Sequence, residues 1–289
     1  MRQSLLPQSS AAPASGASRP RWLRLPLLCC QAAGGDPRLA EPAAAAWVLL
    51  YAAAHLLDNI QDGDPPDAWW EQLGSGPAGN VATGLIATSS LLLTSGPEPP
   101  PSKDLLIQDF FQTVLQMSSA QHFDLTVAAP SLEDSWRMAE AKSGAFFGLA
   151  CRAGARAAGI DEALVSHYST YGVNLGLLVQ IGDDLGDLAA VKSGRSGHGL
   201  LALPMAYFMS VASPAAREEM LQSGRGSNGL LESAPGVIEL LESSGAGLYL
   251  MANIHELRQK ARCALALATQ PSAALEELLE LLESSPTSA

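Results

Sequence analysis

Residues 177–188 read LLVQIGDDLGDL and close a segment that has carried no charged residue since Tyr168. Three carboxylates follow one another here, at Asp183, Asp184 and Asp187, and no Lys or Arg lies within a helical turn of them. In a helix, Asp183 and Asp187 lie one turn apart on the same face, where two like charges repel each other. We therefore expect a bound cation to neutralise this acidic segment.

A second acidic segment lies earlier in the chain, where residues 55–64 read HLLDNIQDGD after an Ala-rich apolar run. Asp58 and Asp62 are again spaced by one helical turn. Mg²⁺ prefers oxygen ligands and is usually held by one or two carboxylates together with substrate phosphates. Two such segments, each at the end of a nearly uncharged helix, predict two carboxylate faces that meet around Mg²⁺ across the core of a helical bundle.

The composition narrows the class of protein. The chain has 289 residues, of which 47% are hydrophobic and 16% charged, with a net charge of -12. An acidic chain is a poor partner for nucleic acid, whose phosphates need a basic footprint. The uncharged stretches 42–57, 72–97 and 200–216 are interrupted by Gly, Ser, Thr, Asn or Pro. A spanning helix needs about 20 predominantly apolar residues, so we expect buried helices and not an integral membrane protein.

The N-terminal residues 1–18 are rich in Ser, Ala and Pro, which predicts a disordered tail. The arginines that precede the first acidic residue, Asp36, are also typical of a targeting peptide. Four cysteines without a CxxC pair fit a reducing compartment. We expect a cytoplasmic protein with one domain over residues 19–289, with organellar import as the alternative.

Helical periodicity runs through that domain, and no segment has the alternation of a strand. Breaks at Gly and Pro separate the expected helices. They cover residues 22–33, 38–61, 69–73, 78–93, 104–121, 136–158, 161–187, 204–211, 236–241, 245–268 and 273–284, and residues 131–134, SLED, resemble a helix start before the segment 136–158. The sequence therefore predicts an all-α fold.

Four blocks of sequence resemble the trans-isoprenyl diphosphate synthase, or polyprenyl synthetase, family. Residues 180–187, QIGDDLGD, resemble its second Asp-rich motif, and residues 57–62, LDNIQD, resemble the first, with Asn59 in place of an Asp. Residues 120–125, AQHFDL, resemble its GQxxDL segment, and residues 142–145, KSGA, resemble its KTGA segment. The order and spacing of the blocks span most of the chain, which makes the resemblance more specific than either acidic motif alone.

The resemblance implies a single-domain isoprenoid synthase bundle with a central active-site cavity, in a homodimer. It implies an Mg²⁺-dependent prenyltransferase that ionises an allylic prenyl diphosphate and condenses it with isopentenyl diphosphate. The implied metal ligands are Asp58, Asp62, Asp183, Asp184 and Asp187. The implied catalytic residues are Asp58, Asp62, Lys142, Gln180 and Asp183. The residues implied in substrate binding are Arg19, Arg21, Gln121, Lys142, Ser143, Gln180 and Lys192.

The chain also departs from the family pattern. The family has an Arg-Arg-Gly segment after the first motif, whereas no Lys or Arg occurs here between Arg38 and Lys103. This removes fixed positive charge where a diphosphate is expected. Two alternatives therefore stay open. One is a class I terpene synthase-like enzyme, or a prenyltransferase with another acceptor, and the other is a non-catalytic subunit of a heteromeric synthase, against which the intact acidic residues weigh.

Product length in this family depends on residues just before the first motif, which form the floor of the pocket. Ala53 and Ala54 are small. The resemblance therefore implies a deep pocket and a product of C20 or longer, unless Tyr51 closes the pocket one turn deeper.

Overall fold

The computed structural model of the chain describes residues 21–62, 73–94, 103–127, 130–192, 202–223, 235–268 and 271–285. The expected tail, Arg19, most of the expected helix 69–73 and the side chain of Lys192 lie outside this description. Within the described ranges every regular element is a helix, which confirms the all-α prediction.

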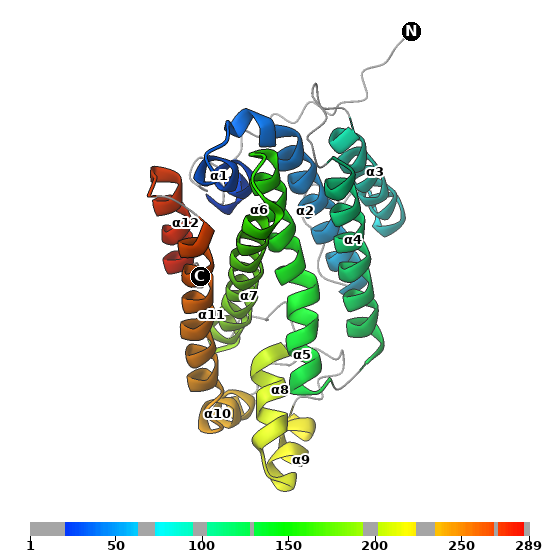
Figure 1. The fold of residues 1–289 in the computed structure, drawn as a ribbon. Coiled ribbons are helices and arrows are strands. Elements are labelled where there is room, and N and C mark those ends of the chain that lie inside the picture. Colours follow the sequence, from blue (N-terminus) through cyan, green and yellow to red (C-terminus); the bar gives the residue numbers. More distant parts are fainter. Residues whose placement is uncertain are drawn as a thin grey trace, which may run out of the picture.

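The helices form one bundle (Figure 1). Its first half contains α1 (Leu25–Ala32), α2 (Glu41–Asp62), α3 (Ser75–Thr94), α4 (Lys103–Thr126), α5 (Leu132–Ala139) and α6 (Ala145–Ala157). The second half contains α7 (Glu162–Lys192), α8 (Ala202–Val211), α9 (Pro214–Ser223), α10 (Pro235–Ser243), α11 (Ala246–Ala268) and α12 (Ala273–Ser284). Three shorter elements are the 3₁₀ turns η1 (Arg21–Arg24) and η2 (Pro37–Ala40) and the π-helical turn η3 (Glu140–Gly144).

Two differences from the expected helices stand out. The helix start expected at residues 131–134 is confirmed, since Ser131 caps α5, but the helix expected to follow through residue 158 is divided by η3 into α5 and α6. Helix α9 was not expected, although its start carries a recognisable signal. Ser213 Oγ accepts a hydrogen bond from the Ala216 N–H at 3.3 Å, and Pro214 occupies the first helical position.

Helix α7 is the centre of the bundle and packs between α6 and α11 (Figure 1). Its apolar residues explain this position, because Tyr168, Tyr171 and Leu178 are fully buried. The Tyr171 hydroxyl donates to the Leu278 carbonyl at 2.8 Å and so ties α7 to α12. A nearly uncharged helix is thus covered on several sides, as its sequence predicts.

Glycines let α7 approach the preceding elements closely. A Cβ atom at Gly176 would lie 2.3 Å from the Ser143 carbonyl oxygen, and one at Gly172 would lie 2.5 Å from the Phe147 carbonyl oxygen. Only a residue without a side chain fits at either position. The contact fixes the second acidic segment of α7 relative to η3.

Helices α2, α4 and α7 end at the same end of the bundle (Figure 1). The last turns of α2 and α7 carry the two acidic segments, and the last turns of α4 carry the AQHFDL block. Within the described chain, residues 37–62 form one helical segment that is long and apolar enough to cross a bilayer by length and composition alone. Core helices of soluble proteins pass the same test, and α2 supplies Trp47 and Leu50 to the main core.

Candidate active site

A lysine lies between the acids of two separate helices. Lys142, in η3, places its Nζ atom 3.2 Å from Asp58 Oδ1 on α2 and 3.2 Å from Asp124 Oδ2 on α4. Burial lowers the pKa of Lys142, but the attraction of the two carboxylates outweighs it and leaves this pKa above its ordinary value. Lys142 is therefore charged, and it joins three of the four sequence blocks.

The π-helical turn gives Lys142 this place. The Ala145 N–H donates to the Glu140 carbonyl, five residues earlier, and a π turn of this kind often marks a functional site. Just beyond the turn, the Trp47 Nε1–H donates to the Phe146 carbonyl at 2.9 Å. An indole of α2 thus holds the start of α6 in place behind the lysine.

Asp62, the second acid of the first segment, is held by an amide. Gln121 Nε2 donates to Asp62 Oδ1 at 3.1 Å, while Gln121 Oε1 is buried and has no hydrogen-bond partner among the described residues. Partial burial of the Asp62 carboxylate raises its pKa, and repulsion from Asp58 raises it further. This corner holds surplus negative charge and an unused carbonyl oxygen, and both favour a hydrated cation.

The second acidic segment divides into two environments. The Asp183 side chain reaches solvent. Even so, its loss of hydration next to the protein, and then repulsion from Asp187, raise its pKa to about 6. Asp184 is only 4% exposed, and its burial raises its pKa to about 7 against the effect of two hydrogen bonds. These bonds come from the Leu203 N–H at 2.9 Å and from Gln180 Nε2 at 3.4 Å.

Ser143 and Gln180, both predicted to bind substrate, contact each other. Ser143 Oγ donates to Gln180 Oε1 at 2.8 Å. The fourth sequence block therefore joins the other three through the residue next to Lys142. The structure thus connects the four blocks, far apart in the chain, by direct side-chain contacts.

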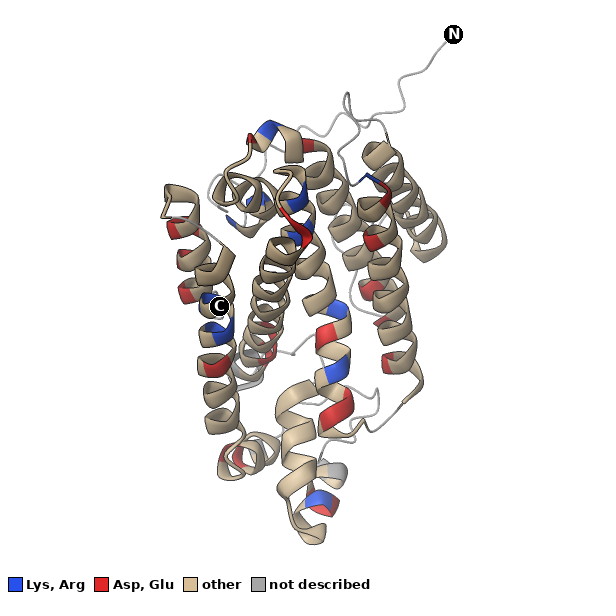
Figure 2. Ribbon diagram, viewed as in Figure 1, with Lys and Arg blue, Asp and Glu red and all other residues tan. Residues whose placement is uncertain are grey.

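The charged residues are unevenly distributed over the helices (Figure 2). Helix α3 carries neither acidic nor basic residues, whereas acids recur along α4. Arg21, predicted to bind substrate, pairs with Glu280 of α12 at 2.6 Å, and Arg24 pairs with Glu277 at 2.9 Å. Both arginines contact α12 instead of the acidic segments, so a role for Arg21 in binding a diphosphate stays a prediction.

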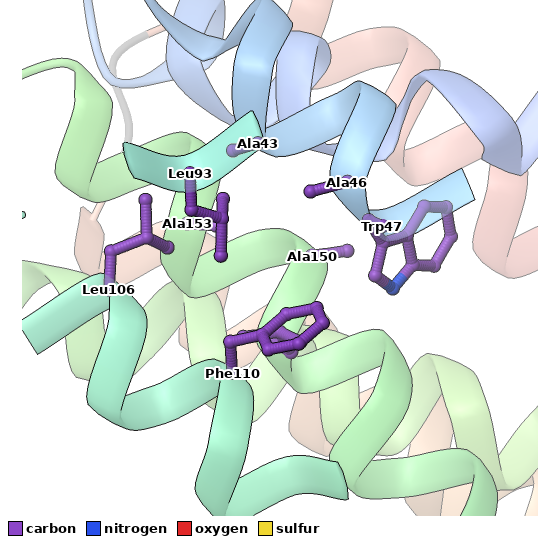
Figure 3. A pocket seen from close by; sticks show the side chains of 9 residues that line it. Ala43, Ala46, Trp47, Leu93, Leu106, Phe110, Ala150 and Ala153 are labelled. Atoms are coloured by element: carbon purple, nitrogen blue, oxygen red, sulfur yellow. The ribbon is translucent and has the colours of Figure 1, made fainter. Parts of the chain in front are cut away.

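The alanines predicted to set product length lie on α2, about one helical turn before Asp58. Ala53 is fully buried and packs with Leu56, Ala78 and Ala82, so it faces α3, while Ala54 is half-buried. The structure also has a small apolar pocket deeper in the bundle (Figure 3). It is lined by Ala43, Ala46, Trp47, Leu93, Leu106, Phe110, Leu149, Ala150 and Ala153.

A deep pocket was expected next to Ala53 and Ala54, whereas neither alanine lines this one. Ala46 lies three turns before Asp58 on α2, which places the pocket about 18 Å from the acids along the helix axis. Tyr51 lies on α2 between the pocket at Ala46 and the acidic segment at Asp58. It is partly exposed and contacts the rings of Trp22 and His55. Its ring therefore belongs to an aromatic cluster of η1 and α2, and Tyr51 does not line the pocket.

A scan against protein-family models matches residues 15–233 to the polyprenyl synthetase model. The chain belongs to the polyprenyl synthetase family. Membership agrees with the four connected blocks and confirms the resemblance seen in the sequence.

Two curated relatives are named as a prenyl diphosphate synthase and as a prenyltransferase. A geranylgeranyl diphosphate synthase of Mycobacterium tuberculosis is 30% identical over 187 residues, which cover 62% of this chain and 52% of that protein. A tryptophan prenyltransferase, ComQ, of Bacillus subtilis subsp. natto is 31% identical over 152 residues, which cover 52% of this chain and 46% of that protein. The matches thus span about half the length of these relatives.

Solved structures show the same fold. Geranylgeranyl pyrophosphate synthetase from Pyrococcus horikoshii superposes with a TM-score of 0.80 at 21% identity, over 91% of this chain and 84% of that one. A polyprenyl synthetase from Streptomyces coelicolor gives a TM-score of 0.79 at 21% identity, over 90% and 83% of the two chains. The polyprenyl synthetase chain described here is therefore an isoprenoid synthase bundle.

Proposed function

We propose that this polyprenyl synthetase is an Mg²⁺-dependent prenyltransferase that ionises an allylic prenyl diphosphate and condenses it with isopentenyl diphosphate. The observation that carries the proposal is the position of Lys142, charged and 3.2 Å from both Asp58 and Asp124. One cation shared by two acids leaves the site negative. A diphosphate can enter such a site only together with added positive charge.

The donor set fits Mg²⁺. No three of the described His, Cys, Asp and Glu residues come together as a ready-made metal site. Mg²⁺ needs no such group, because one or two carboxylates and the substrate phosphates complete its ligands. The pairs that would hold it are Asp58 with Asp62 and Asp183 with Asp187. When bound, Mg²⁺ supplies Lewis-acid stabilisation of the leaving diphosphate.

The chain's own residues then have distinct tasks. Lys142 donates to a diphosphate oxygen and helps to carry the charge that develops as the carbon–oxygen bond breaks. Gln121 and Gln180 orient groups around the reacting carbon through their amides. The apolar core behind them excludes water, which would otherwise capture the allylic cation.

The proposal is tested with Asp58→Asn and Asp183→Asn, which keep the shape of each side chain and remove its charge. We expect both variants to lose at least about a hundredfold in turnover, the scale of a lost electrostatic contact in a transition state. Their circular dichroism should match that of the wild type. Wild-type turnover in either variant would show that these carboxylates do not serve the reaction.

We also propose that the functional form is a homodimer joined through α3 and α4. Helix α3 has no charged residue and packs mainly on α2, at the side of the bundle (Figure 1). Large apolar side chains on these two helices are exposed, at Val81, Leu91, Leu105, Phe111, Leu115 and Leu125. Exposed apolar side chains gathered on two helices favour a protein partner, and a second copy buries α3 without any unpaired charge.

A second candidate acceptor is favoured by the missing basic residues. Two diphosphates bring more negative charge than one diphosphate, and Lys142 is already engaged twice. A neutral acceptor adds no negative charge to the site. One relative is named as a tryptophan prenyltransferase. Incubation with geranyl diphosphate and either isopentenyl diphosphate or N-acetyltryptophanamide distinguishes the two, because the products differ in mass.

A further inference from the structure

Asp184 differs from the two acids beside it. Asp183 reaches solvent, whereas Asp184 is 4% exposed and turns toward the start of α8. In a helix, adjacent residues point about 100° apart, so Asp183 and Asp184 leave α7 in different directions. Asp187 lies within one turn of both, and Asp184 differs from Asp183 and Asp187 by its burial and by its hydrogen bond to the start of α8.

Both oxygens of Asp184 already accept hydrogen bonds from this chain. Oδ2 accepts from the Leu203 N–H at 2.9 Å, and Oδ1 accepts from Gln180 Nε2 at 3.4 Å. The same Gln180 amide accepts from Ser143 Oγ at 2.8 Å. A continuous polar path therefore leads from the residue next to Lys142, through α7, to the backbone of α8.

The first turn of α8 needs such a partner. The first N–H groups of a helix have no partner within the helix, and Pro204 has no N–H at all. A carboxylate at this end also interacts favourably with the helix dipole. At its middle, α8 is held by the ring of Tyr207, which stacks on Tyr249 of α11 with a centroid distance of 4.3 Å.

We propose that Asp184 is a positioning residue and not a metal ligand: it fixes Gln180 and the first turn of α8, and leaves Asp183 and Asp187 to face the cation. This changes the assignment that the family resemblance implies for Asp184. The metal part of this inference rests on the proposed function. The contact between Asp184 and Leu203 does not.

The contact is tested by hydrogen exchange at the Leu203 amide in the full chain. Asp184→Ala removes the acceptor, so this amide should exchange at least about tenfold faster, as expected for the loss of a hydrogen bond to a charged group. Asp184→Asn keeps an acceptor oxygen and should restore most of the protection, with Gln180 turning its amide to match. Unchanged exchange in Asp184→Ala would overturn the proposal.

The metal part is tested by calorimetric titration of MgCl₂ into the protein with inorganic diphosphate, which requires no turnover. Asp183→Asn should weaken Mg²⁺ binding by at least about tenfold, because the loss of a ligand costs no less than the loss of a residue that orients one, whereas the hydrogen bonds of Asp184 go to Gln180 and Leu203 and to none of the proposed ligands. Asp184→Asn should bind Mg²⁺ within about twofold of the wild type, a difference that corresponds to well under one hydrogen bond. Equal weakening in both variants would show that Asp184 is a ligand.

Measurement of turnover distinguishes a failure of this inference from a failure of the proposed function. If the wild type transfers prenyl groups, Asp184→Asn should lower kcat without changing the Mg²⁺ concentration that gives half of the maximal rate. If the wild type shows no transfer, the proposed function fails. The exchange and calorimetric results then still decide the role of Asp184.

Discussion

Lys142 Nζ lies 3.2 Å from Asp58 Oδ1, although 84 positions separate the two residues in the sequence. The contact joins the π-helical turn η3 to the last turns of α2. It also brings a cation into a part of the chain whose sequence has no Lys or Arg between Arg38 and Lys103. The lysine from a later block thus supplies positive charge to the first acidic segment.

Replacement of this lysine should remove turnover and leave the fold intact. Lys142→Met keeps much of the apolar stem and loses the charge, so we expect turnover to fall at least about a hundredfold. The matched control is Lys103→Met, because Lys103 donates to the Thr94 carbonyl at the exposed start of α4, at the other end of that helix from Asp124. Steady-state rates measure both variants, and equal rates would contradict the assigned role of Lys142.

The close approach of α7 to η3 should be sensitive to a single methyl group. In Gly176→Ala the new Cβ would meet the Ser143 carbonyl oxygen at 2.3 Å, and a backbone atom cannot move away cheaply. We expect a loss of about 1–3 kcal/mol in the free energy of unfolding, as for overpacked cores. Gly247→Ala on α11 is the control, since its Cβ would meet nothing within 4 Å. Urea denaturation measures both, and equal stability would show that the two elements are not in contact.

A partly buried acid between two arginines should matter more for stability than an exposed pair. Asp109 Oδ2 contacts Arg156 Nη1 at 2.6 Å and Arg152 Nε at 3.1 Å, and the Arg156 side chain is 7% exposed. Asp109→Ala leaves both guanidinium groups without this partner, and we expect a cost of about 3 kcal/mol in unfolding free energy.

The control for Asp109 is Glu133→Ala. Its pair with Arg137 is largely exposed, with side chains 78% and 65% accessible, so its loss should leave the free energy of unfolding almost unchanged. Thermal denaturation compares the two variants. Similar midpoints would mean that water or the other partners of the two arginines, Glu162 and Ser169, satisfy them without Asp109.

The proposed dimer contact should be broken by one charge. Leu115 on α4 is 66% exposed, and Leu115→Glu places a carboxylate in the apolar surface of α3 and α4. We expect the variant to sediment as a monomer, because an unpaired charge is costly in a buried interface. Leu248→Glu, at a 75% exposed site on α11, should remain dimeric. A wild-type monomer, or dimers of both variants, would exclude this interface.

Much of the site follows from the sequence, because its acidic pairs have helical spacing and end uncharged helices. Asp58, Asp62 and Lys142 were expected at one site, and the structure connects them through contacts with Asp124 and Gln121. The role of Asp124 could have been found from its position in the AQHFDL block.

Other features depend on tertiary packing and have no local signal. Residues 136–158 have an unbroken helical pattern, which does not show that η3 interrupts it. The direction of Asp184 depends on the start of α8, which the chain reaches only after residues 193–201. The apolar pocket at Ala46 depends on the way four helices converge.

The central claim is prenyl transfer from an allylic diphosphate, and product analysis tests it most directly. Purified protein with Mg²⁺ is incubated with geranyl, farnesyl or geranylgeranyl diphosphate, with and without isopentenyl diphosphate, and the products are identified by mass spectrometry. We expect longer prenyl diphosphates that form only when both isopentenyl diphosphate and Mg²⁺ are present. Hydrocarbons or alcohols formed without isopentenyl diphosphate would indicate a terpene synthase, and an absence of any product would contradict the claim.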